Sequence, residues 1–347
     1  MGEMSCCNSY LVKKSFVKNK SQQQAGSPIP QAARRKLPTP RVIILTMKPH
    51  PDSLQRFLFE QSHVRGELVH LDDAWREVLK RHDYPPALRA VMGELMAAAV
   101  LLAATLKLKG ALILQIQGQG PVTLLVVECD GELNVRATAK WQGELDGIGF
   151  AQMVGDGRFV ITLDPRDGGQ TYQGIVELDG ASVAEVLQNY MLRSDQLETR
   201  LWLAADAHGA AGLLLQKMPG GGGYAIAKDE DGQDDDMWQR VTMLTDTLRS
   251  AELLGLPAVE LIRKLYREED VRLFDTQQVA FRCTCSRDRV ARMLKMLGWD
   301  EVQSVLAEQA MVEVRCEFCN HQYLFDKVDA EQVFAAEVLL DASAAVH

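Results

Sequence analysis

The chain has 347 residues, of which 47% are hydrophobic and 24% charged, and it contains seven cysteines. This length and composition exclude a wholly disordered chain and predict a buried core divided over about two domains. The formal net charge of −9 argues against nucleic acid as the main partner, because contacts to phosphates require a basic surface.

The first 46 residues differ in composition from the rest of the chain. They hold eight Lys and Arg and one acidic residue, and they include the polar stretch "KNKSQQQAGSPIPQ". Such a segment is typical of a disordered leader, and a transit peptide would share its basic, acid-poor character. We interpret residues 1–46 as a disordered leader or a wrongly assigned start, with the natural product beginning at Met47.

No segment with the features of a secretory signal or a membrane span is predicted. The longest apolar run, Leu95 to Ala104, has ten residues, about half of what a bilayer span requires, so we expect a buried helix there. No charged region followed by an apolar stretch and a cleavage site opens the chain. The expected compartment is therefore a reducing cytoplasm, where clustered cysteines bind metals or react as thiols.

Residues 47–227 carry the alternating patterns of an α+β domain. Leu71, Trp75, Val78 and Leu79 share one helical face, and "DYPP" at 83–86 ends that helix. The following elements are predicted in order: a helix over 87–107, three strands within 111–145, a hairpin of 158–164 and 171–178, a helix over 182–191, and a strand pair of 199–207 and 211–219.

The third of the strands within 111–145 alternates most regularly. Its apolar positions are Leu133, Val135, Ala137, Ala139 and Trp141, and its polar positions are Glu132, Asn134, Arg136, Thr138 and Lys140. This period of two predicts a half-buried strand in an antiparallel sheet.

A helical linker is predicted over residues 228–280. The preceding "GGGG" at 220–223 lacks the Lys-Ser or Lys-Thr of a phosphate loop, so it is interpreted as a flexible connector before an acidic boundary. Helical spacing then recurs over 237–254 and 257–266; the first of these stripes is Met237, Val241, Leu244, Leu248 and Ala251. We expect this linker to dock weakly on the first domain and to be metastable.

Four cysteines occur as Cys283-x-Cys285 and, thirty residues later, Cys316-x-x-Cys319. Four thiolates satisfy tetrahedral zinc and leave no open position for a substrate water, so a structural rather than a hydrolytic site is expected. His321 is an alternative to one thiolate. Two short helices and a returning strand fit between the pairs, which predicts a zinc domain over 281–334 and a tail over 335–347. The remaining cysteines, Cys6, Cys7 and Cys129, are interpreted as incidental.

Thiolates on zinc are also the species that oxidants attack. Cysteines at i and i+3 close a small disulfide readily, whereas cysteines at i and i+2 lie near the upper limit of the allowed Cα separation. Bridging within each pair would remove every ligand and unfold the module.

These motifs resemble the redox-regulated holdase chaperones of the heat-shock protein 33 family. The likeness runs from "LQRFLFEQSHVRGELV" through "NYMLRSDQLETRLWL", "LLLQKMP" and "LYREEDVRLFD" to "FRCTCSRDRV" and "CEFCNHQYLF", about four fifths of the chain. The basic leader does not match the usual start of the family.

The resemblance implies a non-enzymatic chaperone whose zinc ligands are Cys283, Cys285, Cys316 and Cys319. Oxidation would form the disulfides Cys283-Cys285 and Cys316-Cys319, release zinc and unfold the linker. It further implies a homodimer in the oxidised state that holds unfolded clients without ATP and passes them to ATP-dependent foldases. The charge and the apolar pattern predict no nucleic acid or membrane as partner.

Two other functions remain as alternatives. A zinc ribbon that binds nucleic acid would use the same cysteines, but residues 281–330 hold seven Lys and Arg against eight Asp and Glu, a poor surface for phosphates. A thiol oxidoreductase would use Cys316 and Cys319 catalytically, but the sequence lacks the βαβ context of such enzymes.

Overall fold

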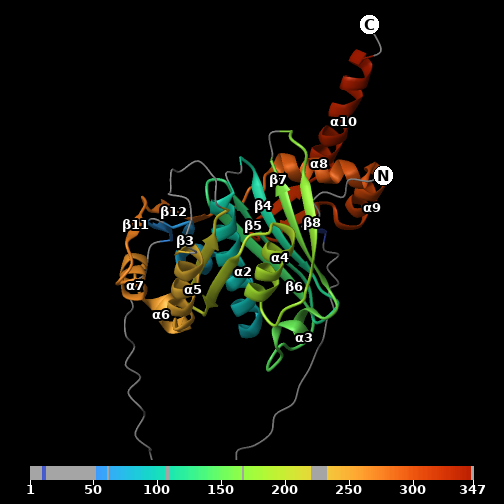
Figure 1. The fold of residues 1–347 in the computed structure, drawn as a ribbon. Helices are drawn as coiled ribbons and strands as arrows, with labels where there is room; N and C mark the ends of the chain where they lie inside the picture. The colour runs from blue at the N-terminus through green and yellow to red at the C-terminus, as the bar shows by residue number, and fades with distance from the viewer. Residues whose placement is uncertain are drawn as a thin grey trace, which may run out of the picture. The chain divides into compact units, whose positions relative to one another are not determined.

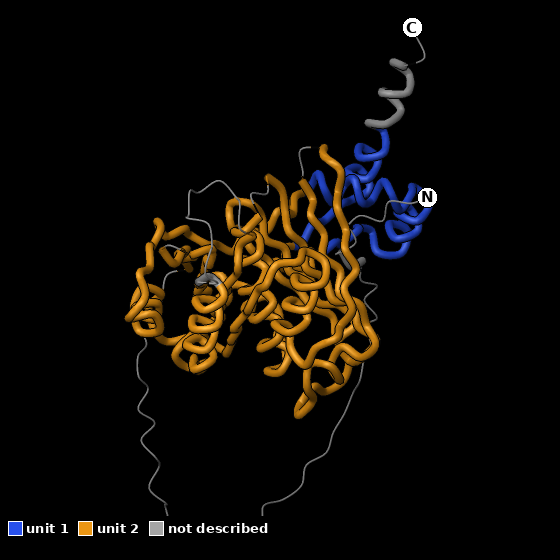
Figure 2. Tube along the Cα trace, viewed as in Figure 1, with its two compact units in different colours: residues 1–48, 287–315, 322–347 blue, residues 49–286, 316–321 orange. Residues whose placement is uncertain are grey.

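The computed structural model describes residues 10–12, 52–60, 62–106, 109–165, 168–219 and 233–344. The chain forms two compact units (Figure 2). The larger unit comprises residues 49–286 and 316–321, and the smaller unit comprises residues 1–48, 287–315 and 322–347. The predicted leader lies outside the described residues except for a short strand, β1 (Tyr10–Val12), in the smaller unit.

The larger unit contains two six-stranded sheets and seven helices among its described residues (Figure 1). Its elements are β2 (Ser53–Phe59), β3 (Val64–Leu71), α1 (Asp73–Leu79), α2 (Pro86–Thr105), β4 (Ala111–Gln117), β5 (Val122–Asp130), β6 (Asn134–Trp141), α3 (Phe150–Val154), β7 (Arg158–Asp164), β8 (Tyr172–Glu177), α4 (Val183–Ser194), β9 (Thr199–Ala205), β10 (Ala210–Lys217), α5 (Gln233–Asp246), α6 (Ser250–Gly255), α7 (Ala258–Leu265), β11 (Val271–Leu273), β12 (Gln277–Gln278) and β13 (Ala280–Phe281).

The strands pair almost entirely as antiparallel neighbours. The first sheet has the order β11-β2-β3-β10-β9, with β12 also paired to β2, and the second sheet has the order β13-β6-β5-β4-β7-β8. Only β13, among the described strand pairings of these two sheets, runs parallel to its neighbour, β6. This architecture confirms the predicted α+β class.

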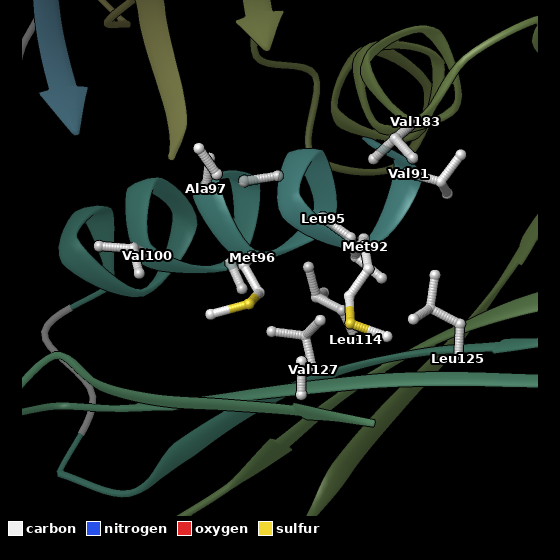
Figure 3. Close-up of a cluster of buried hydrophobic side chains, with 14 of the residues drawn as sticks. Val91, Met92, Leu95, Met96, Ala97, Val100, Leu114, Leu125, Val127 and Val183 are labelled. Carbon is white, nitrogen blue, oxygen red and sulfur yellow. The ribbon is translucent and has the colours of Figure 1, made fainter. Parts of the chain in front are cut away.

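Helix α2 forms the centre of the larger unit. Its buried side chains join one hydrophobic cluster with residues of both sheets and of α4; Figure 3 shows Met92, Met96 and Leu95 above Leu114, Leu125 and Val127 of the second sheet. Among the described helices, α2 alone has the length and apolar composition of a membrane span. Its burial between the two sheets identifies it as the core helix predicted from the sequence.

Small residues allow α2 to approach the first sheet closely. A Cβ on Gly93 would lie 2.4 Å from the Cβ of Ala205, and one on Gly212 would lie 2.9 Å from a methyl carbon of Leu101. Side chains at these two positions would force the helix away from β9 and β10, since packed interiors leave no room for such overlap.

Helices α5, α6 and α7 cover the face of the first sheet that points away from α2 (Figure 1). Tyr266, directly after α7, packs edge-to-face on Phe59 with ring centroids 4.9 Å apart, and its ring also contacts Phe57. Its hydroxyl lies 2.6 Å from Thr245 Oγ1 of α5. The segment predicted as a linker is thus docked in this structure through a second hydrophobic cluster, separate from the one around α2.

The smaller unit has its own hydrophobic core. It contains α8 (Arg287–Leu297), α9 (Trp299–Gln309), β14 (Val312–Cys316, whose last residue belongs to the larger unit), β15 (Gln322–Phe325) and α10 (Lys327–Ala344). Its sheet has the order β1-β14-β15, and Val290, Val314 and Phe325 are among its fully buried side chains. The two helices and the strand expected between the cysteine pairs are confirmed, whereas α10 occupies most of the range predicted as a tail.

Several predicted boundaries differ from the structure. Leu71 belongs to the end of β3 rather than to a helix, and α1 begins at Asp73. Leu133 precedes β6 with a positive φ of 61°, so it lies in the turn and not on the strand. The strands β2 and β3, which the sequence analysis did not assign, pair with each other, and β3 also pairs with β10.

The predicted linker differs most in its secondary structure. The expected helix over 237–254 is interrupted between α5 and α6, and Ala251, expected on its apolar stripe, is exposed. Residues 271–281 form the three short strands β11, β12 and β13 rather than continuing as helix. The end of the segment is therefore held by backbone pairing to both sheets.

Candidate metal centre

Cys283 is positioned by the short strand β13. Ala280 and Phe281 pair with Asn134 and Val135 of β6, and the N–H of Arg282 donates to the carbonyl of Val135 at 3.3 Å. The chain therefore leaves the edge of the second sheet one residue before Cys283.

Cys316 and Cys319 lie in a tight turn at the end of β14. The N–H of Asn320 donates to the carbonyl of Cys316 at 2.8 Å, and the N–H of Cys316 donates to the carbonyl of His321 at 2.9 Å. Asn320 closes this turn with φ = 59°. Asparagine is among the few residues that adopt this left-handed conformation at modest cost.

The backbone of Asn320 gives a direct prediction. Replacing Asn320 by Val places a β-branched residue in the left-handed region, which costs about 1–2 kcal/mol, and we expect metal affinity to fall about 5- to 30-fold. Asn320→Gly is the matched control, because glycine adopts this φ without strain. Chelator competition measures both affinities, and an Asn320→Val protein with the wild-type affinity would refute this role of the turn.

The cysteine turn is fixed to the polar face of β6. The carbonyl of Glu317 accepts hydrogen bonds from Thr138 Oγ1 at 3.0 Å and from His82 Nε2 at 2.8 Å. Lys140 Nζ lies 2.7 Å from Glu317 Oε1. The face of β6 that was expected to meet solvent is therefore partly covered, and Thr138 is only 2% exposed.

The structure brings the four predicted sulfur ligands together. All four Sγ atoms lie within 4.8 Å of one another, with Cys283 3.6 Å from Cys316 and Cys285 3.3 Å from Cys319. A Zn–S distance of about 2.3 Å gives a tetrahedron with S···S edges of about 3.8 Å, so the donor set and its spacing fit a tetrahedral ion. This group could hold a metal ion, and soft thiolate donors favour zinc over hard cations.

The thiols influence one another strongly. Hydrogen bonds from Cys316, and to a smaller extent from Cys319, hold the pKa of the Cys283 thiol well below its usual value. The charge of Arg136 contributes less in the same direction. Interaction with Cys283 raises the pKa of both Cys316 and Cys319. The group therefore favours a thiolate at Cys283, and a bound cation would stabilise the remaining three thiolates.

Neither Cys129 nor the side chain of His321 belongs to this group. His321 is exposed and is not a member of the four-ligand cluster. Cys129 is fully buried in the core around α2, where burial raises the pKa of its thiol. Cys6 and Cys7 lie outside the described residues.

The contacts of His82, Thr138, Lys140 and Arg136 with the cysteine segments were not predicted. The alternation of β6 placed Arg136, Thr138 and Lys140 on one face, but nothing in the sequence indicated what would cover that face. His82 had no signal beyond its position before the "DYPP" that ends the first helix.

Comparisons with known proteins agree with this architecture. A family model described as "Hsp33 protein" matches residues 52–326. A "33 kDa chaperonin" from Methylobacillus flagellatus is 57% identical, with 85% of this chain and 99% of the relative covered. A protein of the same name from Chromobacterium violaceum is 52% identical, with 86% and 99% covered.

A solved structure shares the fold. The crystal structure of a 33 kDa chaperonin, a heat shock protein 33 homologue from Thermotoga maritima, aligns with a TM-score of 0.71 at 21% identity, covering 83% of this chain and 99% of that one. At this identity the likeness supports the fold alone, whereas the family match and the closer relatives extend over most of the sequence. The chain therefore belongs to the Hsp33 family of chaperones.

Proposed function

We propose that this chain is a redox-regulated, ATP-independent holdase whose metal is zinc. The observation that carries the proposal is the position of the thiol group: Cys283 follows directly on the segment of α5 to β13, and that segment covers a large apolar face of the first sheet. A chemical change at the cysteines would therefore act on the C-terminal end of the segment of α5 to β13, which covers this face.

The hidden face has the composition of a client-binding surface. It contributes eight buried apolar side chains from four strands: Phe57, Phe59, Val64, Leu68, Ala204, Ala211, Leu213 and Leu215. Contiguous apolar surface of this kind binds unfolded chains or promotes association when exposed. If the helices left this face, the exposed apolar side chains would form a holdase site, and the sheet itself would not need to refold.

The covering segment is held by short elements. Helices α6 and α7 have six and eight residues, and β11, β12 and β13 have three, two and two. Helices of this length are unstable alone and depend on tertiary packing. Polar groups are also buried beneath them, since His70 Nε2 lies 2.8 Å from the carbonyl of Leu253. Such a segment is expected to open at a lower free energy than the core.

Oxidation supplies the trigger in this account. Zinc, when bound, keeps the four sulfurs deprotonated and in place. A thiolate attacks one oxygen of peroxide, an S–O bond forms, the O–O bond breaks, and hydroxide leaves a sulfenic acid. A second thiolate then attacks that sulfur, and a second hydroxide leaves as the disulfide forms. Two peroxides therefore convert four thiolates into two disulfides.

We propose that the disulfides are Cys283-Cys285 and Cys316-Cys319, because each pair lies within one short stretch of chain. The sulfur contacts Cys283–Cys316 and Cys285–Cys319 run between the pairs; in a tetrahedral group every sulfur neighbours the other three, so these contacts do not decide the pairing. Peptide mapping of the oxidised protein distinguishes the two arrangements.

The remaining properties follow from the same account. We propose that the oxidised chain is a homodimer, that its partners are unfolded proteins and the ATP-dependent foldases that receive them, and that it works in a reducing cytoplasm without enzymatic turnover. No observation on the described residues favours the zinc-ribbon alternative.

The test is an aggregation assay with a thermally unfolding client. We expect the reduced, zinc-loaded protein to give little protection. The peroxide-treated protein should suppress aggregation once each chain has consumed two peroxides, with reversal by reductant and zinc. Equal protection by both forms would reject redox regulation. Salt-dependent binding to duplex DNA or RNA by the reduced form would instead support the zinc-ribbon alternative.

A further inference from the structure

A guanidinium group lies against one corner of the four-sulfur group. Arg136 of β6 donates a hydrogen bond from Nη1 to Cys283 Sγ at 3.5 Å. Its Nε and Nη2 donate to Glu128 Oε2 at 3.0 and 2.5 Å. Its Cζ also lies 4.1 Å from the ring centroid of Phe318, which stands between Cys316 and Cys319 in the chain. The guanidinium is therefore held by three groups at once.

Both charged side chains of this arrangement are largely buried. The side chain of Arg136 is 12% exposed and that of Glu128 is 10% exposed. The positive charge is permanent, because the guanidinium of arginine is not deprotonated in proteins. Salt screens a charge little at this depth.

A cation at this position opposes the reactions of Cys283. Four thiolates around one divalent ion carry a formal charge of 2−, and a charge-assisted hydrogen bond draws electron density from the sulfur that accepts it. Peroxide oxidation begins when a sulfur lone pair forms the S–O bond, so a sulfur with less electron density reacts more slowly. The same hydrogen bond stabilises the charged ligand set and favours metal retention.

We propose that Arg136 is a positioning residue that restrains Cys283 and thereby sets the oxidant threshold of the switch. This inference rests on the proposed redox function and adds a residue outside the four ligands that regulates it. Glu128 anchors the guanidinium, and Phe318 ties it to the second cysteine pair. A purely structural ion pair between Arg136 and Glu128 would require no contact with sulfur.

The variant that tests this is the double substitution Arg136→Gln/Glu128→Gln. Removing Arg136 alone would leave a buried carboxylate without its partner, whereas the double variant removes both charges and retains similar volumes. In the cobalt-substituted protein we expect the sulfur-to-cobalt charge-transfer band to move to lower energy, because the sulfur regains electron density. We also expect metal affinity to fall about ten-fold or more, and metal release at low peroxide to become several-fold faster.

Arg282→Gln is the matched control. Arg282 adjoins Cys283 in the chain, and its replacement also removes a guanidinium charge, but its side chain is 67% exposed and its ion-pair contact is to Glu132 at 3.9 Å. We expect its charge-transfer band and release rate to match the wild type. Equal shifts in the control and the double variant would overturn the proposal. A folded double variant with the charge-transfer band and the metal-release rate of the wild type would also overturn it.

Two further outcomes are decided separately. If the double variant does not bind cobalt, the variant to test is Arg136→Lys, because lysine cannot bridge Glu128 and Cys283 with a planar fork. A charge-transfer band of the Arg136→Lys protein equal to that of the wild type would then overturn the proposal. If the wild-type protein releases no metal under peroxide, the proposed function fails, while the cobalt band still reports whether Arg136 acts on the sulfur.

Discussion

Replacing Cys316 by serine should abolish stable metal binding and make protection of clients independent of peroxide. The substitution removes one of four sulfurs that lie within 4.8 Å of one another. Structural zinc sites of this kind supply about 10–16 kcal/mol of apparent binding free energy, and a hydroxyl is a poor replacement for a thiolate. Without this anchor, we expect the segment of α5 to β13 to open on mild heating alone.

The measurement for Cys316→Ser combines metal content with client aggregation, each with and without peroxide. Cys129→Ala is the matched control, because Cys129 is buried outside the sulfur group, and its protein should switch like the wild type. A Cys316→Ser protein that retains one zinc per chain and responds normally to peroxide would refute the assignment of this ligand.

Replacing Ile262 by aspartate should expose the apolar face without any oxidation. Ile262 of α7 is 2% exposed and belongs to the cluster that joins the helices to the first sheet. Burying a carboxylate there would cost several kcal/mol, which is more than an eight-residue helix can offset, so we expect α7 to leave the sheet. The reduced protein should then protect clients while its metal remains bound.

The matched control introduces the same residue one position later. Arg263 is exposed on the same helix, so Arg263→Asp should leave α7 docked and the protein inactive when reduced. If folded, reduced Ile262→Asp protein still requires peroxide for activity, the apolar face under α7 is not the client-binding surface.

The sequence predicts most clearly the elements whose patterns are local. The turn signals and period-two patterns that predicted three strands within 111–145 correspond to β4, β5 and β6, and the apolar run of Leu95 to Ala104 lies within the buried helix α2. The cysteine spacing likewise predicted a group of four sulfurs, which the structure brings together. The strands and the helix follow from residues that are close in the chain. The sulfur group follows from the preference of a tetrahedral metal ion for four thiolates.

Features that depend on distant partners were not predictable in the same way. The strands at 271–281 are too short to show a period, and they are strands only because β2 and β6 offer free edges. The polar side chains of Thr138 and Lys140 look like a solvated face until Glu317, far along the chain, covers them. Arg136 was assigned to that face, but its contact with Cys283 exists only in the folded chain.

The proposed switch couples the sulfur group to the docking of α5, α6 and α7. Hydrogen exchange of the amides of residues 233–265, measured on the same samples as metal release during a peroxide titration, tests it most directly. The account predicts that protection of these amides is lost in proportion to the metal released, while amides of α2 remain protected, and that reductant with zinc restores both. Release of the metal with unchanged protection of α5, α6 and α7 would contradict it.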